Sequence, residues 1–305
     1  MASLETNGTR IAYQQFGEGP DLIMVHGLAA NRAFWMTGLA PLLRDHFRIT
    51  LYDLRGHGYS ATPPSGYSAV QQADDLAALM THLNIRRAPI VAHSFGGAVA
   101  LEFAVKHPDR VSQLALLDAK INRLQPTLKL ADCDQLTPFE QELIGEVTDV
   151  DWAAEEQIGI RFLETVAERR VAGIHSQITN DFVPFADRRG NGRDARHWLR
   201  LLRETTARAE FVSTDGASPE AIAELTLPVL LMYGEHSRVR PSGERLKALL
   251  PNARAVTVPR AGHFFPARAP RVVLQALAPL LGLDLATPQQ RPSAVFAGWA
   301  TATCS

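Results

Sequence analysis

The chain has 305 residues, of which 46% are hydrophobic and 21% are charged, and its formal net charge is −1. A chain of this length and composition can bury a large core, and without a basic excess it is not expected to bind nucleic acid or a membrane surface. Its two cysteines, Cys133 and Cys304, are too far apart in the sequence to indicate a disulfide framework or a zinc site. We therefore expect neither a metal nor a cofactor.

Targeting signals are not evident in the sequence. Residues 1–8 contain no basic segment followed by an apolar run, and no stretch of 18 apolar residues occurs in the chain. These features predict a cytoplasmic protein without a membrane partner. The sequence leaves the oligomeric state open.

The first half of the chain alternates strands with amphipathic helices. Residues 9–16 alternate in the manner of an exposed edge strand, whereas residues 21–25 form a continuous apolar run typical of buried parallel strands, and residues 48–52 return to a strand pattern. Helical spacing of apolar residues follows in 33–43 and 70–83. This alternation predicts a mostly parallel sheet covered by helices on both faces, with functional groups at the carboxyl ends of the strands.

The segment from Pro89 to Gly97 reads Pro-Ile-Val-Ala-His-Ser-Phe-Gly-Gly and concentrates more chemistry than any other. It begins as a buried strand and leads into a helix at 98–104, so Ser94 lies on the sharp turn between them. A serine on such a turn is lifted into a cleft, where N–H groups at the start of the helix can bind an oxyanion. The usual pattern is Gly-x-Ser-x-Gly. Here Ala92 replaces the first glycine, and its methyl group is the smallest addition that the turn could hold.

The second half of the chain divides into a helical segment and a return of the strand pattern. A buried strand is expected at 111–117, directly before Asp118. Helical periodicity without buried strands follows, which predicts an inserted helical cap. We therefore divide the chain into a core of residues 1–118 and 227–285, a cap of residues 119–226, and a Pro- and Gln-rich tail of residues 286–305 that we expect to be mobile.

Four segments in this order resemble the α/β-hydrolase superfamily, over about residues 9–282: His26-Gly27, Asp53-Leu-Arg-Gly-His-Gly-Tyr-Ser60, His93-Ser-Phe-Gly-Gly97 and Gly262-His-Phe264. The resemblance is to the serine hydrolase branch with a helical cap. It implies an α/β-hydrolase fold, that is, a mostly parallel eight-stranded sheet flanked by helices, with the cap inserted between strands six and seven. It also implies Ser94 as the nucleophile and His263 as the base. The backbone N–H groups of Leu28 and Phe95 would form the oxyanion hole.

The acid of the expected triad is the point at which the chain departs from the family. An imidazole base needs a partner that fixes its tautomer and stabilises its charged form. Most capped hydrolases supply an aspartate in a Gly-Glu-x-Asp loop after strand seven, but here the loop reads Gly234-Glu-His-Ser237. Asp118 is the preferred replacement, because it ends strand six and lies 24 residues after Ser94, which resembles the arrangement in several haloalkane dehalogenases. Two alternatives stay open: Glu235 turns toward His263, or the site has no acid.

The nucleophile narrows the expected reaction. Dehalogenases and epoxide hydrolases of this fold use aspartate at the elbow, so Ser94 predicts hydrolysis of a carboxylic ester, thioester or lactone through an acyl-enzyme. The alternatives are a cofactor-free perhydrolase or C–C bond hydrolase of the same fold, and a catalytically weak ligand-binding protein. We expect a small-molecule acyl substrate, either free or bound to a carrier. The cap should select it, because the cap covers the cleft with side chains such as Phe162.

Overall fold

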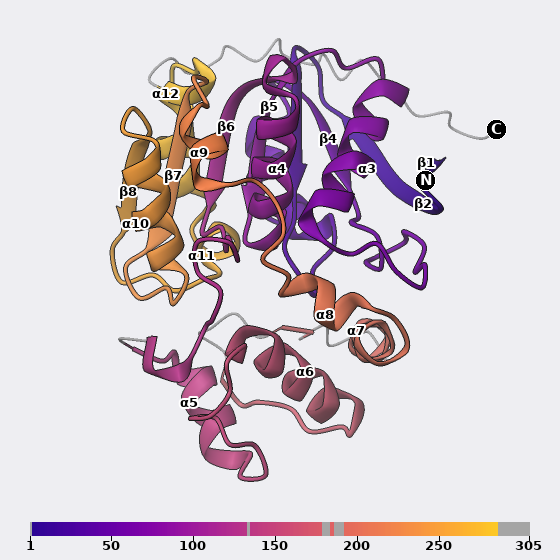
Figure 1. Cartoon of the computed structure of the whole chain (residues 1–305), viewed down its shortest axis with the longest axis vertical. Helices are drawn as coiled ribbons and strands as arrows, with labels where there is room; N and C mark the ends of the chain where they lie inside the picture. Colours follow the sequence, from indigo (N-terminus) through magenta and orange to yellow (C-terminus); the bar gives the residue numbers. More distant parts are fainter. Residues whose placement is uncertain (1, 133–134, 179–183, 186–191, 286–305) are drawn as a thin grey trace, which may run out of the picture.

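The computed structural model describes residues 2–132, 135–178, 184–185 and 192–285. The tail that the sequence predicts to be mobile lies outside these residues. Eight strands form one sheet in the order β1-β2-β4-β3-β5-β6-β7-β8 (Figure 1). The strands are β1 (Ala2–Thr6), β2 (Thr9–Phe16), β3 (Asp21–Val25), β4 (Arg48–Tyr52), β5 (Ala88–His93), β6 (Val111–Leu117), β7 (Val229–Gly234) and β8 (Arg254–Val258). Only the pairs β1–β2 and β2–β4 are antiparallel, so the mostly parallel sheet is confirmed.

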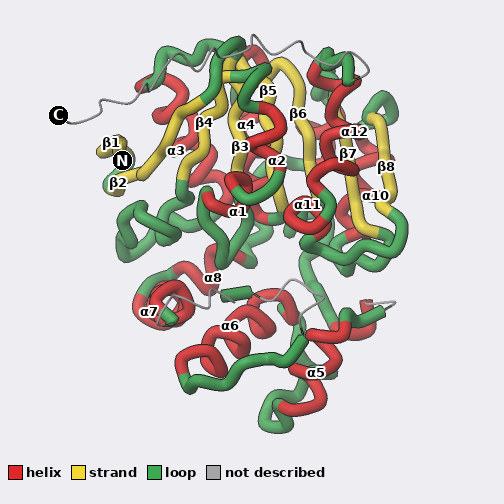
Figure 2. The backbone as a smooth tube through the Cα atoms, turned by 180° about the vertical axis from the view of Figure 1, so that it is seen from behind, coloured by secondary structure: helices red, strands yellow, loops and turns green. Residues whose placement is uncertain are grey.

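The central strands are apolar throughout because both faces of the sheet are covered. In β3, Leu22 and Met24 pack into the core on one face, whereas Ile23 and Val25 pack into the core on the other. The face of Ile23 and Val25 carries α3 (Ala69–His82), α4 (Phe95–Lys106), α9 (Pro219–Ala223) and α10 (Arg240–Leu249). The opposite face, seen in Figure 2, carries α1 (Ala33–Met36), α2 (Leu39–Leu43), α11 (Phe265–Arg268) and α12 (Pro270–Leu281). None of the described helices is both long enough and apolar enough to cross a membrane.

Two local expectations need correction. The strand at 9–16 is not at the edge of the sheet, because β1 pairs with it on its outer side. Most side chains of β1 are exposed, so no apolar alternation marks it in the sequence. The expected helix at 33–43 is two short helices, α1 and α2, which are separated at Thr37 and Gly38.

Helices inserted between β6 and β7 form a separate layer beyond one end of the sheet. They are α5 (Pro138–Glu146), α6 (Ile158–Val171), α7 (Arg193–Glu204) and α8 (Ala207–Phe211), and Figure 1 shows them together below the strands. The start of α5 is encoded locally, since Thr137 and Glu140 form a capping box. The fifth inserted helix, α9, packs instead against α4 and α10 beside the sheet. The bounds of the cap as a domain stay a prediction.

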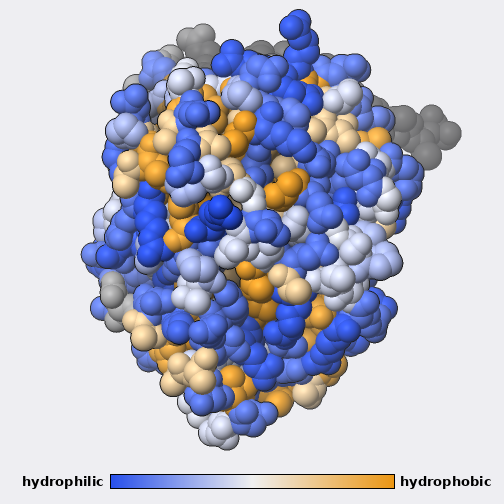
Figure 3. Space-filling view, viewed as in Figure 1, coloured by the Kyte–Doolittle hydropathy of each residue, from blue (hydrophilic) through white to orange (hydrophobic). Residues whose placement is uncertain are grey.

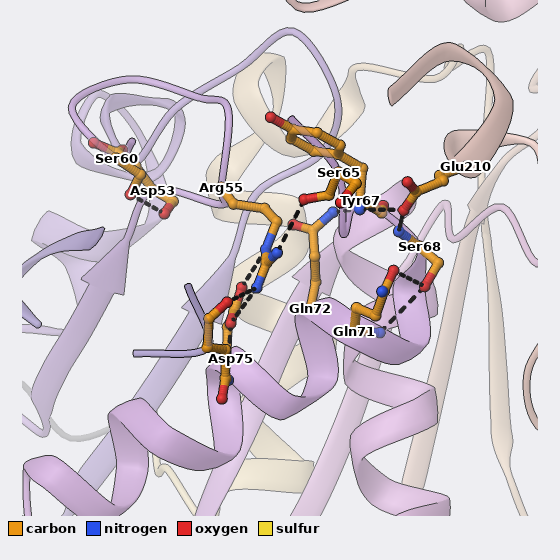
Figure 4. Close-up of polar contacts among 11 residues, drawn as sticks. Asp53, Arg55, Ser60, Ser65, Tyr67, Ser68, Gln71, Gln72, Asp75 and Glu210 are labelled. Carbon is orange, nitrogen blue, oxygen red and sulfur yellow. Dashed lines mark hydrogen bonds and ion pairs between the residues drawn. The ribbon is translucent and has the colours of Figure 1, made fainter. Parts of the chain in front are cut away.

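A buried ion pair fixes the loop that follows β4 (Figure 4). The Arg55 guanidinium donates two hydrogen bonds of 2.7 Å to the carboxylate of Asp75 in α3, and both side chains are at most 5% exposed. A Cβ on Gly66 would collide with this guanidinium, and Gly66 also has a positive φ of 97°. Both features favour glycine at the point where the loop crosses Arg55. Glu210 of α8 then accepts hydrogen bonds from the backbone N–H groups of residues 66–68. The loop therefore joins the sheet layer to the inserted helices.

We predict that Asp75→Asn lowers the free energy of unfolding by about 3–5 kcal/mol, because it leaves the buried Arg55 charge without its carboxylate. Asp74→Asn is the matched control. Asp74 pairs with Lys106 where both side chains are more than 40% exposed, and the loss of such a surface pair should cost less than about 1 kcal/mol. Urea unfolding of both variants measures the difference, and equal costs would contradict this assignment.

Candidate active site

Ser94 lies on a strained turn between β5 and α4. Its backbone has φ 55° and ψ −124°, a conformation that non-glycine residues rarely adopt. Its N–H group donates to the carbonyl oxygen of Leu117 at the end of β6. A Cβ on Gly96 would collide with the His26 carbonyl oxygen, and a Cβ on Gly97 would collide with Ala119. The two glycines therefore allow the neighbouring loops to close tightly around the turn.

His263 connects Ser94 to Asp118. It lies in the loop between β8 and α11, and its Nε2 is 3.0 Å from Ser94 Oγ. Its Nδ1 is 2.7 Å from Asp118 Oδ2. Since a carboxylate only accepts hydrogen bonds, this contact assigns the proton to Nδ1 and leaves Nε2 free to accept the serine proton. The structure thus brings together three residues that follow β5, β6 and β8 in the chain.

Asp118 is fully buried and is held by the loop after β7. Its Oδ1 accepts a 2.8 Å hydrogen bond from the N–H of Gly234, and its Oδ2 accepts one from the Ser237 hydroxyl. Glu235 is placed differently, since its carboxylate accepts a hydrogen bond from the N–H of Arg260. Of the two candidate acids, only Asp118 contacts His263 among the described contacts. Its catalytic role stays a prediction.

The two residues expected to form the oxyanion hole lie beside the nucleophile. Leu28 and Phe95 line the same cavity as Ser94 and His263. The loop that carries Leu28 can approach so closely because Gly27 has no side chain, and a Cβ there would lie 2.9 Å from Ser94 Cβ. The role of these two N–H groups stays a prediction.

The cavity lies between the sheet and the inserted helices. Most of its lining is apolar, and the inserted segment contributes Ile160, Phe162 and Leu163 from α6 and Phe211 from α8. Hydrophobic side chains are grouped near the middle of the face in Figure 3, where this layer meets the sheet. The lining also includes two residues that the sequence did not single out as functional, Lys120 and Arg238. Within the described residues, no three His, Cys, Asp or Glu side chains are grouped so that they could hold a metal ion.

The chain is similar in sequence and in structure to known proteins. A family model described as the alpha/beta hydrolase fold matches residues 20–141. The 2-(acetamidomethylene)succinate hydrolase of Mesorhizobium japonicum is 28% identical over 269 residues, which are 86% of this chain and 87% of that protein. The solved structure of a hydrolase from Pseudomonas aeruginosa is 25% identical, has a TM-score of 0.64, and covers 92% of this chain and 98% of that chain. The chain belongs to the α/β-hydrolase superfamily.

A shorter and closer similarity covers only part of a larger relative. An uncharacterised protein of Mycobacterium tuberculosis is 37% identical over 113 residues, which are 37% of this chain and 33% of that protein. The matched segment thus spans about a third of that relative's length.

Two buried histidines of this α/β-hydrolase chain bind the loops around the nucleophile to one another. His26 Nδ1 is 2.8 Å from the Gly27 carbonyl oxygen, and its Nε2 accepts from the N–H of Leu54. His57 Nδ1 donates to the Arg55 carbonyl oxygen, and its Nε2 accepts a 3.2 Å bond from the N–H of Ala29. Because the backbone N–H groups need an acceptor, both rings must be neutral. Burial lowers the pKa of His26 to about 4 and that of His57 to about 3.

A third buried histidine supports the base. His93 Nε2 donates to the backbone carbonyl oxygen of His263 at 3.0 Å, and its ring stacks on Phe34. Burial holds the pKa of His93 well below its usual 6.5. The family resemblance predicts a structural role for His93, in the motif directly before Ser94, and not the role of the base.

These histidines predict an acid-sensitive fold. Each has a lower pKa in the folded chain than the 6.5 of an unfolded histidine, so its contribution to stability is present above pH 6.5. That contribution is lost as the pH falls from 6.5 toward the folded pKa values, about 4 for His26 and about 3 for His57. Near pH 5 the unfolded chain should bind about two more protons at His26 and His57 than the folded chain, which corresponds to about 3 kcal/mol per pH unit, and the lowered pKa of His93 acts in the same direction.

Urea unfolding between pH 7 and pH 5 measures this slope. Averaged over this range, His57→Gln should lower it by about 1 kcal/mol per pH unit, because one titrating ring is removed and the amide oxygen can still accept from Ala29. His82→Gln changes an exposed histidine and should leave the slope as it is. An unchanged slope in His57→Gln would show that this ring does not contribute.

Proposed function

We propose that the protein is a serine hydrolase that cleaves a carboxylic ester, thioester or lactone. The observation that carries this proposal is the continuous contact from Ser94 Oγ through the His263 ring to the Asp118 carboxylate, at 3.0 and 2.7 Å. A nucleophile, a base and an acid in this order are the arrangement that activates a serine hydroxyl. The strained turn supports the proposal, because such strain occurs where a side chain must be presented to a ligand.

The proposed mechanism uses only groups of this chain and water. Ser94 Oγ attacks the acyl carbon while His263 Nε2 accepts its proton, and Asp118 stabilises the resulting imidazolium without becoming protonated itself. The negative charge on the acyl oxygen is held by the N–H groups of Leu28 and Phe95, the latter at the start of α4. His263 then donates the proton to the leaving group. A water molecule, deprotonated by the same ring, hydrolyses the acyl-enzyme.

We assign residues 119–226 to a cap over this site. The assignment is supported by the part of the cavity lining that comes from α6 and α8, opposite Ser94 and His263. Side chains such as Phe162 would then contact the acyl group or the leaving group, so the inserted segment would select the substrate. The substrate is accordingly a small acyl compound.

The first test removes the nucleophile. Ser94→Ala should lower kcat for p-nitrophenyl acetate and butyrate by at least about 10⁴-fold, because no other elbow hydroxyl can replace it. His263→Ala should cost a similar factor, and the double variant should be no slower than either single variant by more than a few-fold. Ser65→Ala, an exposed serine, is the control. Retention of most of the activity in Ser94→Ala would refute the proposal, and absence of turnover in the unmodified protein would favour a ligand-binding role.

The second test concerns the acid. Asp118→Asn should lower kcat by up to about 10⁴-fold, because an amide favours the wrong tautomer of His263 and leaves the imidazolium unpaired. Glu235→Gln should be nearly silent, since the Glu235 carboxylate binds the backbone at Arg260. The opposite pattern would assign the acid to Glu235, and mild effects of both would show that the site works without one.

A rescue variant adds a sharper readout to that test. The Ser237 hydroxyl lies within hydrogen-bond distance of the Asp118 carboxylate, so Ser237→Asp should place a new carboxylate beside His263. In the Asp118→Asn background this change should restore part of the lost kcat. In the unmodified chain it should instead lower activity, because two carboxylates would compete for one buried site.

A further inference from the structure

Lys120 places a cation in the cavity that also holds Ser94. It follows Asp118 by two positions, and its backbone N–H lies 3.3 Å from the Ser94 carbonyl oxygen. Lys120 is one of the residues that line the cavity together with Ser94 and His263. Neither the proposed triad nor the oxyanion hole uses this side chain.

The Lys120 ammonium is bound by neutral groups alone. Its Nζ donates to Asn122 Oδ1 at 2.9 Å and to the backbone carbonyl oxygen of Gln125. In the part of the chain that the structure describes, no carboxylate forms an ion pair with it within 4.0 Å. Burial, together with repulsion from Arg245, lowers the pKa of Lys120 to about 8. An ammonium has three N–H donors, and these contacts occupy two of them.

The partners of Lys120 are themselves held in place. Ser242 Oγ donates to Gln125 Oε1 at 2.9 Å, and Gln125 Nε2 donates to the Arg238 carbonyl oxygen at 3.0 Å. Both Gln125 and Ser242 are buried. Such a network fixes the carbonyl group that orients the ammonium, which is how a binding site keeps a charged group ready for a ligand.

The other residues that line the cavity differ from Lys120 in charge or in their ion pairing. The other charged side chains that line it, Arg238 and Glu140, form an ion pair with each other. The residues around them are mostly apolar, such as Leu128, Ile160 and Val239. In a mostly apolar pocket, a few placed polar groups fix the orientation of the ligand.

We propose that Lys120 binds a carboxylate of the substrate, so that the protein hydrolyses esters, thioesters or lactones that carry a second, anionic group. This inference rests on the proposed function, since it takes the cavity around Ser94 as the substrate site. The carboxylate would supply an anion for the Lys120 ammonium and would accept a charge-assisted hydrogen bond from its third N–H group. The same contact would discriminate against neutral substrates of equal length.

The test compares matched pairs of esters. One series consists of p-nitrophenyl esters of acids that end in a free carboxylate, four to eight carbons long, each paired with its methyl-capped neutral analogue. A second series consists of acetyl esters of ω-hydroxy acids, paired with their methyl-capped forms, so that the carboxylate lies on the leaving group. The readout is the ratio of kcat/KM for the charged member to that for the neutral member, with KM and kcat determined separately.

The unmodified protein should prefer the carboxylate in at least one series. Lys120→Met should lower that ratio about 10- to 100-fold, mainly through a higher KM, because one charge-assisted hydrogen bond is removed. Lys120→Gln keeps a donor without the charge and should show the same direction, whereas Lys120→Arg should retain part of the preference. Arg123→Met removes a positive charge from an exposed position of the same segment and should leave the ratio unchanged. Thermal denaturation of each variant checks that it is folded.

A binding measurement separates this inference from the proposed reaction. Calorimetry with Ser94→Ala should detect adipate or suberate more strongly than the monoacids hexanoate or octanoate, and the added change Lys120→Met should remove the difference. Ester turnover with equal ratios in the unmodified protein and in Lys120→Met would overturn the Lys120 assignment and leave the hydrolase. No turnover of any ester, together with Lys120-dependent binding of the diacid, would overturn the hydrolase and leave the anion site.

Discussion

Close packing of the backbone around the turn at Ser94 is the constraint on which the rest of the site depends. A non-glycine residue at φ 55° is strained by about 1–3 kcal/mol, and it persists because neighbouring loops fill the space around it. The glycines Gly27, Gly96 and Gly97 are required there, since side chains at these positions would press against Ser94, His26 and Ala119. The tight packing brings the nucleophile, the start of α4 and the loop after β3 to one point.

The surrounding loops are held by buried polar groups whose protonation state matters. His26 and His57 each donate from one ring nitrogen and accept a backbone N–H at the other, which only the neutral ring can do. Arg55 and Asp75 fix the loop after β4 in the opposite way, as a fully paired charge. The stability of the fold and the geometry of the site therefore depend on the same hydrogen bonds.

The position of the acid follows from the order of the strands. Because β6 and β7 are parallel neighbours, their carboxyl ends meet, and a carboxylate on either one can come close to the loop after β8. Asp118 contacts His263 from the end of β6. Ser237, at the position where the resemblance leads one to expect an aspartate, donates a hydrogen bond to Asp118. Lys120, two positions after Asp118, lines the cavity. The same short segment thus supplies the group beside the base and a lysine that lines the cavity.

The sequence by itself determined the sheet and the elbow, because both depend on local patterns. Buried parallel strands require apolar residues on both faces, so β3 could be recognised as a continuous run and β6 by its apolar end at residues 114–117. The turn at Ser94 needs small residues at fixed spacing, which leaves a motif in the chain.

Only the tertiary structure decided the contacts between distant segments. The placement of Asp118 rather than Glu235 beside His263 depends on side chains that lie more than a hundred positions apart, and no local pattern encodes such a contact. The exposed edge strand β1 was missed because its pairing buries little apolar surface. Lys120 was missed because its meaning comes from the apolar surroundings and neutral partners that the folded chain places around it.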